Sequence, residues 1–254
     1  MTERPRETAR LLELLADPPA EPETGEGYLD LLGPWPRAGQ PTGLTQRLMG
    51  LQAVATVYER YWRPGLGRIA KGICGPSMAG EVDLAAGLLR LAPGDVVLDV
   101  ACGTGQFTRA FAERVGPDGL SIGLDGSRPM LAEAVAATGP DNAVYLRADA
   151  VVPPLRESTV DGLCCFAALH MFDGPYTALD SFTATLRPGG RIALLTTARR
   201  RRQPVRTVDT LGGVLTGQRM FEHGEIAAEL RARGFTEIEQ TYAGVTQIVG
   251  GVLR

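Results

Sequence analysis

Between Val96 and Ala198 the sequence alternates short apolar runs with segments of helical character, and this alternation limits the fold more than any other feature. The apolar runs are VVLDVA, SIGLD, AVYLRAD, VDGLCCFAA and RIALLTTA. Strands that read as continuous apolar runs are buried on both faces, and parallel strands need long crossovers that are usually helices. The region therefore predicts an α/β domain with a doubly wound parallel sheet.

The C-terminal part follows a different pattern. After a helix-like segment, GEIAAELRARG, come two strand-like segments, FTEIEQTYA and VTQIVGGVL, with only a short turn between them. That turn is too short for a crossover, so the last two strands are expected to pair antiparallel.

Residues 1–78 read as an N-terminal extension, and residues 79–254 read as the main domain. In the extension, the run DPPAEPETGEG is rich in Pro, Glu and Gly and predicts a linker or loop. Residues 44–73 predict two helices that are interrupted near Pro64. The main domain is expected to open with a helix over residues 81–91.

Composition and charge exclude several classes of function. The chain has 26 basic and 29 acidic residues, a net charge of −3, so it has no general basic field and no nucleic-acid partner is expected. No window of about 18 uninterrupted apolar residues occurs, so no membrane span is expected. The N-terminal segment lacks the apolar stretch of a secretory signal, which favours a cytoplasmic protein.

The cysteines and histidines do not have the spacing of metal ligands. None of the four cysteines belongs to a CxxC pair, and Cys164 and Cys165 are adjacent in an apolar run. The chain holds only two histidines, His170 and His223. We expect buried free thiols in a reducing compartment, and no bound metal.

A glycine-rich turn follows the first apolar strand, in the sequence Asp99-Val-Ala-Cys-Gly-Thr-Gly. In an open parallel sheet, ligands bind beyond the carboxyl ends of the strands. Gly103 and Gly105 allow the backbone to turn tightly and approach a ligand, and the amides of the next helix suit a carboxylate or phosphate. Thr108 occupies the place of the third glycine in GxGxxG, so the dinucleotide fingerprint is incomplete.

An acidic residue ends each of the next two strands. Asp125 lies 20 residues after Gly105, the distance at which a carboxylate can accept both ribose hydroxyls. Asp149 can accept the adenine amino group, and Met130 can supply an apolar wall for adenine. Each acid alone is also explained by ordinary solvation of a strand end. Their common register with the glycine turn predicts a nucleoside ligand that carries an amino-acid-like carboxylate.

The segment VVLDVACGTGQFTRAFAERVGPDGLSIGLDGSRPMLAEA resembles the class I S-adenosylmethionine-dependent methyltransferases, in their ubiquinone/menaquinone C-methyltransferase-like (type 11) branch. The blocks RADA, VDGLCCFAALHMF and LRPGGRIALLTT follow in the order of that branch, over about residues 80–250. The resemblance implies a Rossmann-like sheet of seven strands, mainly parallel with an antiparallel last strand. It also implies S-adenosylmethionine as cofactor and S-adenosylhomocysteine as product.

The same resemblance implies which residues bind the cofactor. Asp99 and the Gly103–Gly105 turn would hold the methionine end, and Asp125 would hold the ribose. Asp149 and Ala150 would bracket the adenine. The complete set expected at the cofactor is Asp99, Ala101, Gly103, Gly105, Asp125, Gly126, Ser127, Met130, Asp149, Ala150, Phe166, Ala167, Tyr58 and Tyr61.

Two of these residues belong to an expected lid. The family often closes an N-terminal helical segment over the cofactor, and Tyr58 and Tyr61 in VYERYWRP are candidates to reach it. An amphipathic helix that buries these rings in the core explains them equally well.

His170 follows the fourth strand, where the resemblance places the methyl group that faces the acceptor. An imidazole there is a candidate general base for a hydroxyl or an acidified carbon. The alternative is a histidine that orders the methionine end or makes a local hydrogen bond. Alignment alone supplies much of the rate in such transfers, so a base is not required.

The segment after the fifth strand is expected to lie at the acceptor. The run Arg199–Arg202 would bind an anionic acceptor or form a solvated loop, and the loop interpretation is favoured. Residues 203–222 are expected to wall the acceptor pocket, and their apolar members favour a lipophilic acceptor. These members are Val205, Leu211, Val214, Leu215, Met220 and Phe221.

The sequence therefore predicts methyl transfer from S-adenosylmethionine to a carbon or oxygen of a small, apolar or aromatic metabolite. One alternative retains the fold and the cofactor without methyl transfer, as a cyclisation-type catalyst or as a binding module. An NAD-dependent oxidoreductase is disfavoured by Thr108. The acceptor, the atom methylated and the oligomeric state stay open.

Overall fold

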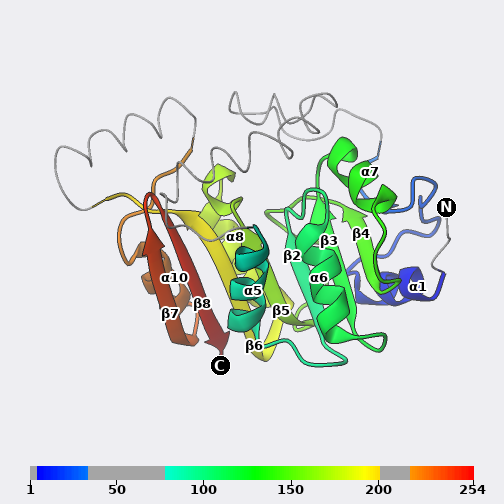
Figure 1. The fold of residues 1–254 in the computed structure, drawn as a ribbon. Coiled ribbons are helices and arrows are strands. Elements are labelled where there is room, and N and C mark those ends of the chain that lie inside the picture. The colour runs from blue at the N-terminus through cyan, green and yellow to red at the C-terminus, as the bar shows by residue number, and fades with distance from the viewer. Residues whose placement is uncertain (1–4, 34–77, 201–217) are drawn as a thin grey trace.

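The computed structural model describes residues 5–33, 78–200 and 218–254 (Figure 1). The predicted lid helices over residues 44–73, with Tyr58 and Tyr61, lie outside the described residues, as does most of the segment 203–222.

The described elements alternate between strands and helices through the central part of the chain. In chain order they are α1 (Pro5–Leu14), β1 (Leu29–Asp30), α5 (Met78–Leu89), β2 (Val96–Val100), α6 (Gln106–Val115), β3 (Leu120–Asp125), α7 (Arg128–Ala136), β4 (Ala143–Arg147), β5 (Val160–Phe166), η2 (Leu169–Met171), α8 (Pro175–Thr185), β6 (Leu186–Thr197), α10 (Glu225–Ala232), β7 (Phe235–Ala243) and β8 (Thr246–Leu253).

All strands join one mixed sheet in the order β1-β4-β3-β2-β5-β6-β8-β7. The strands from β1 to β6 pair in parallel, whereas β8 is antiparallel to both β6 and β7. The predicted α/β class is confirmed, including the antiparallel last strand. The turn of Gly244 and Val245 joins β7 directly to β8, so these two strands can only form a hairpin.

The described residues form eight strands, one more than the predicted seven, because the N-terminal extension contributes β1. This two-residue strand pairs in parallel with β4, with Leu29 opposite Leu146 and Asp30 opposite Arg147. A two-residue strand has no periodicity to detect, and it follows a run whose composition indicates a loop. The strand β6 also begins earlier than the expected apolar run RIALLTTA, at Leu186.

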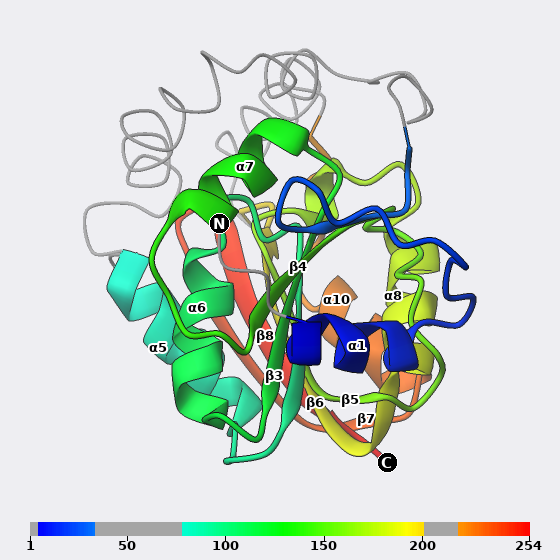
Figure 2. The same ribbon diagram turned by 90° about the vertical axis from the view of Figure 1, so that its right-hand side faces the viewer.

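Helices cover both faces of the sheet, as the doubly wound pattern predicts. Helices α5 and α6 lie on one face, and α1, α8 and α10 lie on the other (Figures 1 and 2). Residues next to each other in a strand point to opposite faces. Cys164 packs in the cluster with α5 and α6, and Cys165 packs in the cluster with α8 and α10.

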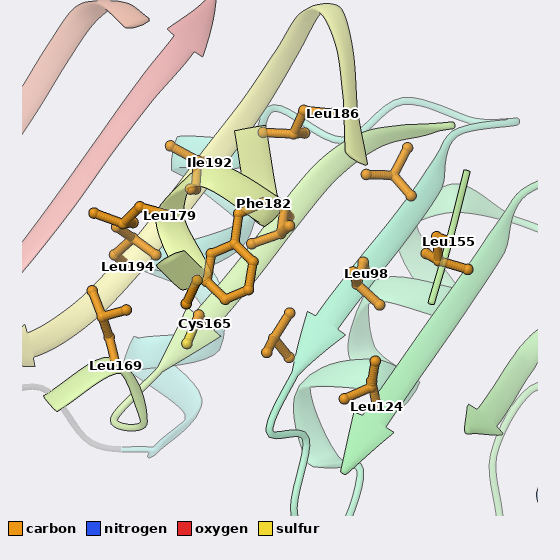
Figure 3. Close-up of a cluster of buried hydrophobic side chains, with 14 of the residues drawn as sticks. Leu98, Leu124, Leu155, Cys165, Leu169, Leu179, Phe182, Leu186, Ile192 and Leu194 are labelled. Carbon is orange, nitrogen blue, oxygen red and sulfur yellow. The ribbon is translucent and has the colours of Figure 1, made fainter. Parts of the chain in front are cut away.

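The larger core cluster joins the central strands to α8. Figure 3 shows Cys165, Ile192 and Leu194 of the strands meeting Leu179 and Phe182 of α8. All five side chains are fully buried. A side chain of this size contributes roughly 1.5–3 kcal/mol when it is removed from water, so this cluster is a main source of stability.

The described cysteines are buried free thiols. Cys102, Cys164 and Cys165 form no disulfide, and Cys74 lies outside the described residues. Burial raises the pKa of the Cys165 thiol to about 12, and burial followed by the nearby charges of Asp125 and Asp99 raises the pKa of Cys102. These thiols stay protonated near neutral pH, which disfavours them as nucleophiles.

Within the described residues, no helix is both long and apolar enough to cross a membrane. No group of three His, Cys, Asp or Glu side chains in this part of the chain is arranged to hold a metal ion.

Candidate cofactor site

The strand order fixes where a ligand can bind. Strand β2 pairs with β3 on one side and with β5 on the other. From β2 the chain continues outward through β3 and β4, and it then returns to β5 and continues outward on the other side through β6. Loops that leave β2 and β5 diverge to opposite sides and open a crevice beyond the carboxyl ends of the strands. Ala101 follows β2 and Ala167 follows β5, which places both at this switch point.

Backbone strain is concentrated at the same place. Ala101 and Ala167 both have positive φ, at 56° and 63°, although neither is a glycine. Left-handed backbone costs energy for residues with a Cβ and persists only where the surroundings impose it. The amide of Ala167 donates to the carbonyl of Leu195 on β6, at 2.8 Å, which holds this loop against the sheet.

The glycine turn between β2 and α6 needs its glycines. Gly103 and Gly105 have φ of 56° and 71°, and Gly105 is the N-cap of α6. A Cβ at Gly105 would lie 2.5 Å from the hydroxyl oxygen of Tyr145 on β4. No side chain caps α6, so the amides of its first turn are oriented for a ligand carboxylate.

Thr108 has a structural role that its place in the sequence did not reveal. Its buried hydroxyl donates to Oδ2 of Asp99, at 2.6 Å. A Cβ at Gly123 on β3 would lie 2.7 Å from that hydroxyl oxygen, so a glycine at position 123 makes room for the contact. Thr108 thus fixes the Asp99 carboxylate beneath the glycine turn.

Asp125 joins two loops of the site. Its Oδ2 accepts the amide of Gly103 at 2.9 Å, and its Oδ1 accepts the amide of Ser127 at 2.8 Å. One carboxylate at the end of β3 therefore positions both the loop after β2 and the loop after β3. Charge-assisted hydrogen bonds of this kind are stronger than those between neutral groups.

Ser127 precedes α7 at a position where a serine often caps a helix with its side chain. Ser127 is the N-cap residue, with Pro129 in the first turn, but its hydroxyl makes no capping bond. The Ser127 Oγ is instead buried without a hydrogen-bond partner among the described residues. A buried hydroxyl is costly without a partner, so Ser127 indicates where a polar ligand atom would bind.

The other expected residues differ in what they expose. Asp149 is exposed, and its Oδ1 accepts the amide of Val151 at 2.8 Å. Met130 is buried in the first turn of α7. The ring of Phe166 packs against Phe107 with 5.2 Å between ring centroids, so core packing occupies this side chain. At the end of β5, Phe166 could therefore contact a ligand through its backbone but not through its ring.

His170 lies in η2, in the connection from β5 to α8. Its Nδ1 is 3.4 Å from the Thr196 hydroxyl oxygen, and its carbonyl accepts the amide of Arg219 at 2.9 Å. Burial lowers the pKa of His170 to about 4. The imidazole is therefore neutral at pH 7, where it is a hydrogen-bonding group and a weak base.

The described part of the acceptor wall differs from expectation. Phe221 is fully buried in the main core, so it does not line a pocket. Arg219 instead lies over the ring of Tyr176, with 4.7 Å from its guanidinium carbon to the ring centroid. In the run Arg199–Arg202, Arg199 pairs with Glu222 at 2.5 Å and Arg200 is exposed, whereas Arg201 and Arg202 lie outside the described residues.

Two residues that the sequence reasoning missed lie beside the site. Arg147, at the end of β4, is only 2% exposed, and its guanidinium bonds Asp30 of β1. The available signal was the arginine that closes the apolar strand AVYLR, because a charged side chain is almost never fully buried unless it is paired.

Comparison with known proteins decides the family. Residues 97–190 match the family model described as a methyltransferase domain. The chain contains a class I S-adenosylmethionine-dependent methyltransferase domain. The matched residues include the glycine turn, Asp125 and the end of β5, which are the parts that meet at the switch point.

Similar proteins support this methyltransferase assignment. An uncharacterized chloroplastic methyltransferase of Arabidopsis thaliana is 32% identical over 161 residues, which is 61% of this chain and 44% of that protein. A demethylmenaquinone methyltransferase of Bacillus cytotoxicus is 33% identical over 114 residues, covering 44% of this chain and 48% of that protein. The chain thus spans about half the length of the curated relatives it matches.

A solved structure shows the same fold. An S-adenosylmethionine-dependent methyltransferase of Aquifex aeolicus aligns with a TM-score of 0.58 and 17% identity, over 80% of this chain and 99% of that one. At this identity the likeness is evidence for the methyltransferase fold alone.

Replacement of Gly105 by alanine tests the close approach of the turn to β4. The new Cβ would lie 2.5 Å from Tyr145, and the alanine backbone would have to keep the positive φ of this position. We therefore expect Gly105→Ala to lower the free energy of unfolding by about 2 kcal/mol. Urea denaturation measures this change. Gly87→Ala is the matched control, because the exposed Gly87 of α5 has nothing within 4 Å of its Cβ position. An equal effect at both positions would contradict the close approach.

The lowered pKa of His170 predicts a pH-dependent stability. Between pH 6.5 and about 4 the unfolded histidine binds a proton that the folded one does not, so acid favours unfolding. His170→Asn removes this dependence. We expect the free energy of unfolding of the unaltered protein to fall by about 2 kcal/mol more than that of the variant between pH 7 and pH 4.5. Parallel pH profiles would show that His170 is not buried as a neutral group.

Proposed function

We propose that the protein transfers the methyl group of S-adenosylmethionine to a carbon or oxygen of a small, lipophilic or aromatic metabolite. The observation that carries the proposal is the convergence of two loops on Asp125, at the switch point of a methyltransferase-type sheet. The family match of residues 97–190 supports the cofactor, and the relatives' names support the reaction class.

The residues fit the nucleoside half of this cofactor. A carboxylate offers about four lone-pair sites, so Asp125 can accept ribose hydroxyls as well as backbone amides. The buried, unpartnered hydroxyl of Ser127 lies in the same loop. Next to it, a Cβ at Gly126 would have only the Ala148 carbonyl oxygen within 4 Å, at 3.9 Å, so the backbone is open at this point.

The residues also fit the amino-acid half. The first turn of α6 has no side-chain cap, and its amides and positive dipole end suit the methionine carboxylate. Asp99 is held below the turn by Thr108, which places a negative charge where the methionine ammonium group would lie. Gly103 and Gly105 keep side chains out of this space.

When bound, the cofactor would supply an activated methyl group, with S-adenosylhomocysteine as the leaving group and the acceptor's proton released to solvent. The protein's own contribution is then alignment and the exclusion of water, which can account for a large part of the rate. His170 is neutral at pH 7, so we assign it a hydrogen bond to the acceptor rather than the role of a strong base. The demethylmenaquinone methyltransferases among the relatives support a lipophilic acceptor.

The free thiols Cys102, Cys164 and Cys165 support a reducing compartment, and we propose that the protein acts in the cytoplasm.

Substitution of Asp125 tests the cofactor site. Asp125→Asn keeps the size of the side chain, but its amide nitrogen cannot accept a hydrogen bond. The one remaining oxygen would then have to accept both the backbone amides of the loops and the ribose hydroxyls. We expect the Kd for S-adenosylmethionine to rise by tenfold or more, roughly the value of one charge-assisted hydrogen bond. Isothermal titration calorimetry measures the affinity. Asp83→Asn, on the exposed face of α5, is the control and should bind normally. An unchanged Kd in Asp125→Asn would contradict the proposed binding of the ribose by Asp125.

Product analysis separates methyl transfer from its alternatives. With S-adenosylmethionine and a panel of quinols, phenols and other lipophilic acceptors, mass spectrometry should find a product that has gained one methyl unit together with S-adenosylhomocysteine. A rearranged product of unchanged mass would indicate a cyclisation-type catalyst. Tight cofactor binding with no turnover across the panel would indicate a binding module.

A further inference from the structure

The strongest unexplained feature of the described residues is a buried ion pair next to the cofactor site. The guanidinium of Arg147 donates to both carboxylate oxygens of Asp30, at 3.0 and 2.9 Å. The Arg147 side chain is 2% exposed and that of Asp30 is 7% exposed. Burying two charges is expensive, so such a pair contributes little net stability compared with apolar residues of similar volume. A role beyond stability is therefore worth seeking.

The position of the ion pair connects it to the loop after β3, which contains Gly126 and Ser127. Along the carboxyl edge of the sheet, Arg147 of β4 is the register partner of Asp30 on β1 and of Asp125 on β3. Its Nε donates to the carbonyl of Gly126, at 3.2 Å. Gly126 lies between Asp125 and Ser127, so Arg147 holds the middle of the loop that the proposed function assigns to the nucleoside.

Asp30 in turn orients the guanidinium. Besides the two contacts from Nη1 of Arg147, the Asp30 carboxylate accepts the amides of Leu32 and Gly33, at 2.9 and 3.1 Å. Arg128, in the first turn of α7, adds a bond to Asp30 Oδ2 at 2.9 Å. The carboxylate is thus fixed from three sides, and it fixes Arg147.

Residues 22–33, which we name the N-terminal strap, are anchored firmly enough to act as this support. Tyr28 is buried in a cluster with Cys102, Leu131, Ala134 and Tyr145, directly behind the glycine turn. A Cβ at Gly27 would lie 2.6 Å from a methyl carbon of Val135, which shows how closely the strap approaches α7.

We propose that the Asp30–Arg147 ion pair is a positioning device for the nucleoside half of the cofactor, and that the N-terminal strap is part of the cofactor site. Asp30 and Arg147 act through the carbonyl of Gly126, which sets the loop that carries Asp125 and Ser127. This inference rests on the proposed function.

The test uses one single variant and one double variant. Asp30→Asn leaves the buried Arg147 charge without its partner, and both stability and affinity should fall. The double variant Asp30→Leu with Arg147→Met removes both buried charges and fills the space with apolar atoms. The amides of Leu32 and Gly33 lose their acceptor, so some stability is lost, but less than in Asp30→Asn, which leaves a buried charge unpaired. Arg128 tolerates this change because it is half-exposed and keeps its contact with Glu26.

The decisive measurement is the affinity of the double variant. Calorimetry with S-adenosylhomocysteine and with 5′-methylthioadenosine should show that Kd rises about tenfold or more for both. The two ligands share the nucleoside and differ in the amino-acid part, so an equal loss locates the effect at the nucleoside. Asp83→Asn, which breaks the exposed pair of Asp83 with Arg114, is the control for an ion pair remote from the loop.

The outcomes are distinct. A stable double variant that binds both ligands as tightly as the unaltered protein overturns the positioning role, and so does a loss confined to S-adenosylhomocysteine. If the unaltered protein binds neither ligand, the proposed function itself fails. Denaturant midpoints measured on the same samples show whether a loss of affinity reflects a loss of folding.

Discussion

The Asp125 carboxylate, which accepts the amides of Gly103 and Ser127, is the contact on which the site depends. These two amides belong to loops that leave different strands, and nothing in local propensity would hold the loops at a fixed separation. A single charged acceptor at the end of β3 does so, because each of its oxygens takes one backbone donor. In the proposed function, the group that joins these two loops is also the group that would bind the ribose.

The sheet makes that contact possible. Because β2, β3 and β5 are parallel and adjacent, their carboxyl ends meet at one edge, and the reversal of strand order at β2 and β5 opens space there. The strained backbones of Ala101 and Ala167 flank this space. Strain of this kind must be offset by packing elsewhere, and the fully buried side chains on both faces of the sheet supply it.

Much of this organisation could be predicted from the sequence, because apolar runs and glycine turns report burial and backbone conformation directly. What the sequence could not supply is the partner of a polar group. Ser127 has the position of an N-cap, yet its hydroxyl makes no cap. Phe166 was expected to line the cofactor, yet its ring joins the core. The lowered pKa of His170 arises from burial of the imidazole, which has no local signature in the sequence.

The Asp30–Arg147 ion pair joins the N-terminal residues to the sheet as one structural unit. The family match begins at residue 97, and the composition of the first residues suggested a separate extension. Yet Asp30 forms an ion pair with the deeply buried Arg147 at the edge of the sheet, and Leu29 is part of the main core. A domain without β1 would leave Arg147 without its carboxylate partner and would remove Leu29 from the main core. The structural unit that positions the loop carrying Asp125 therefore includes the N-terminal strap.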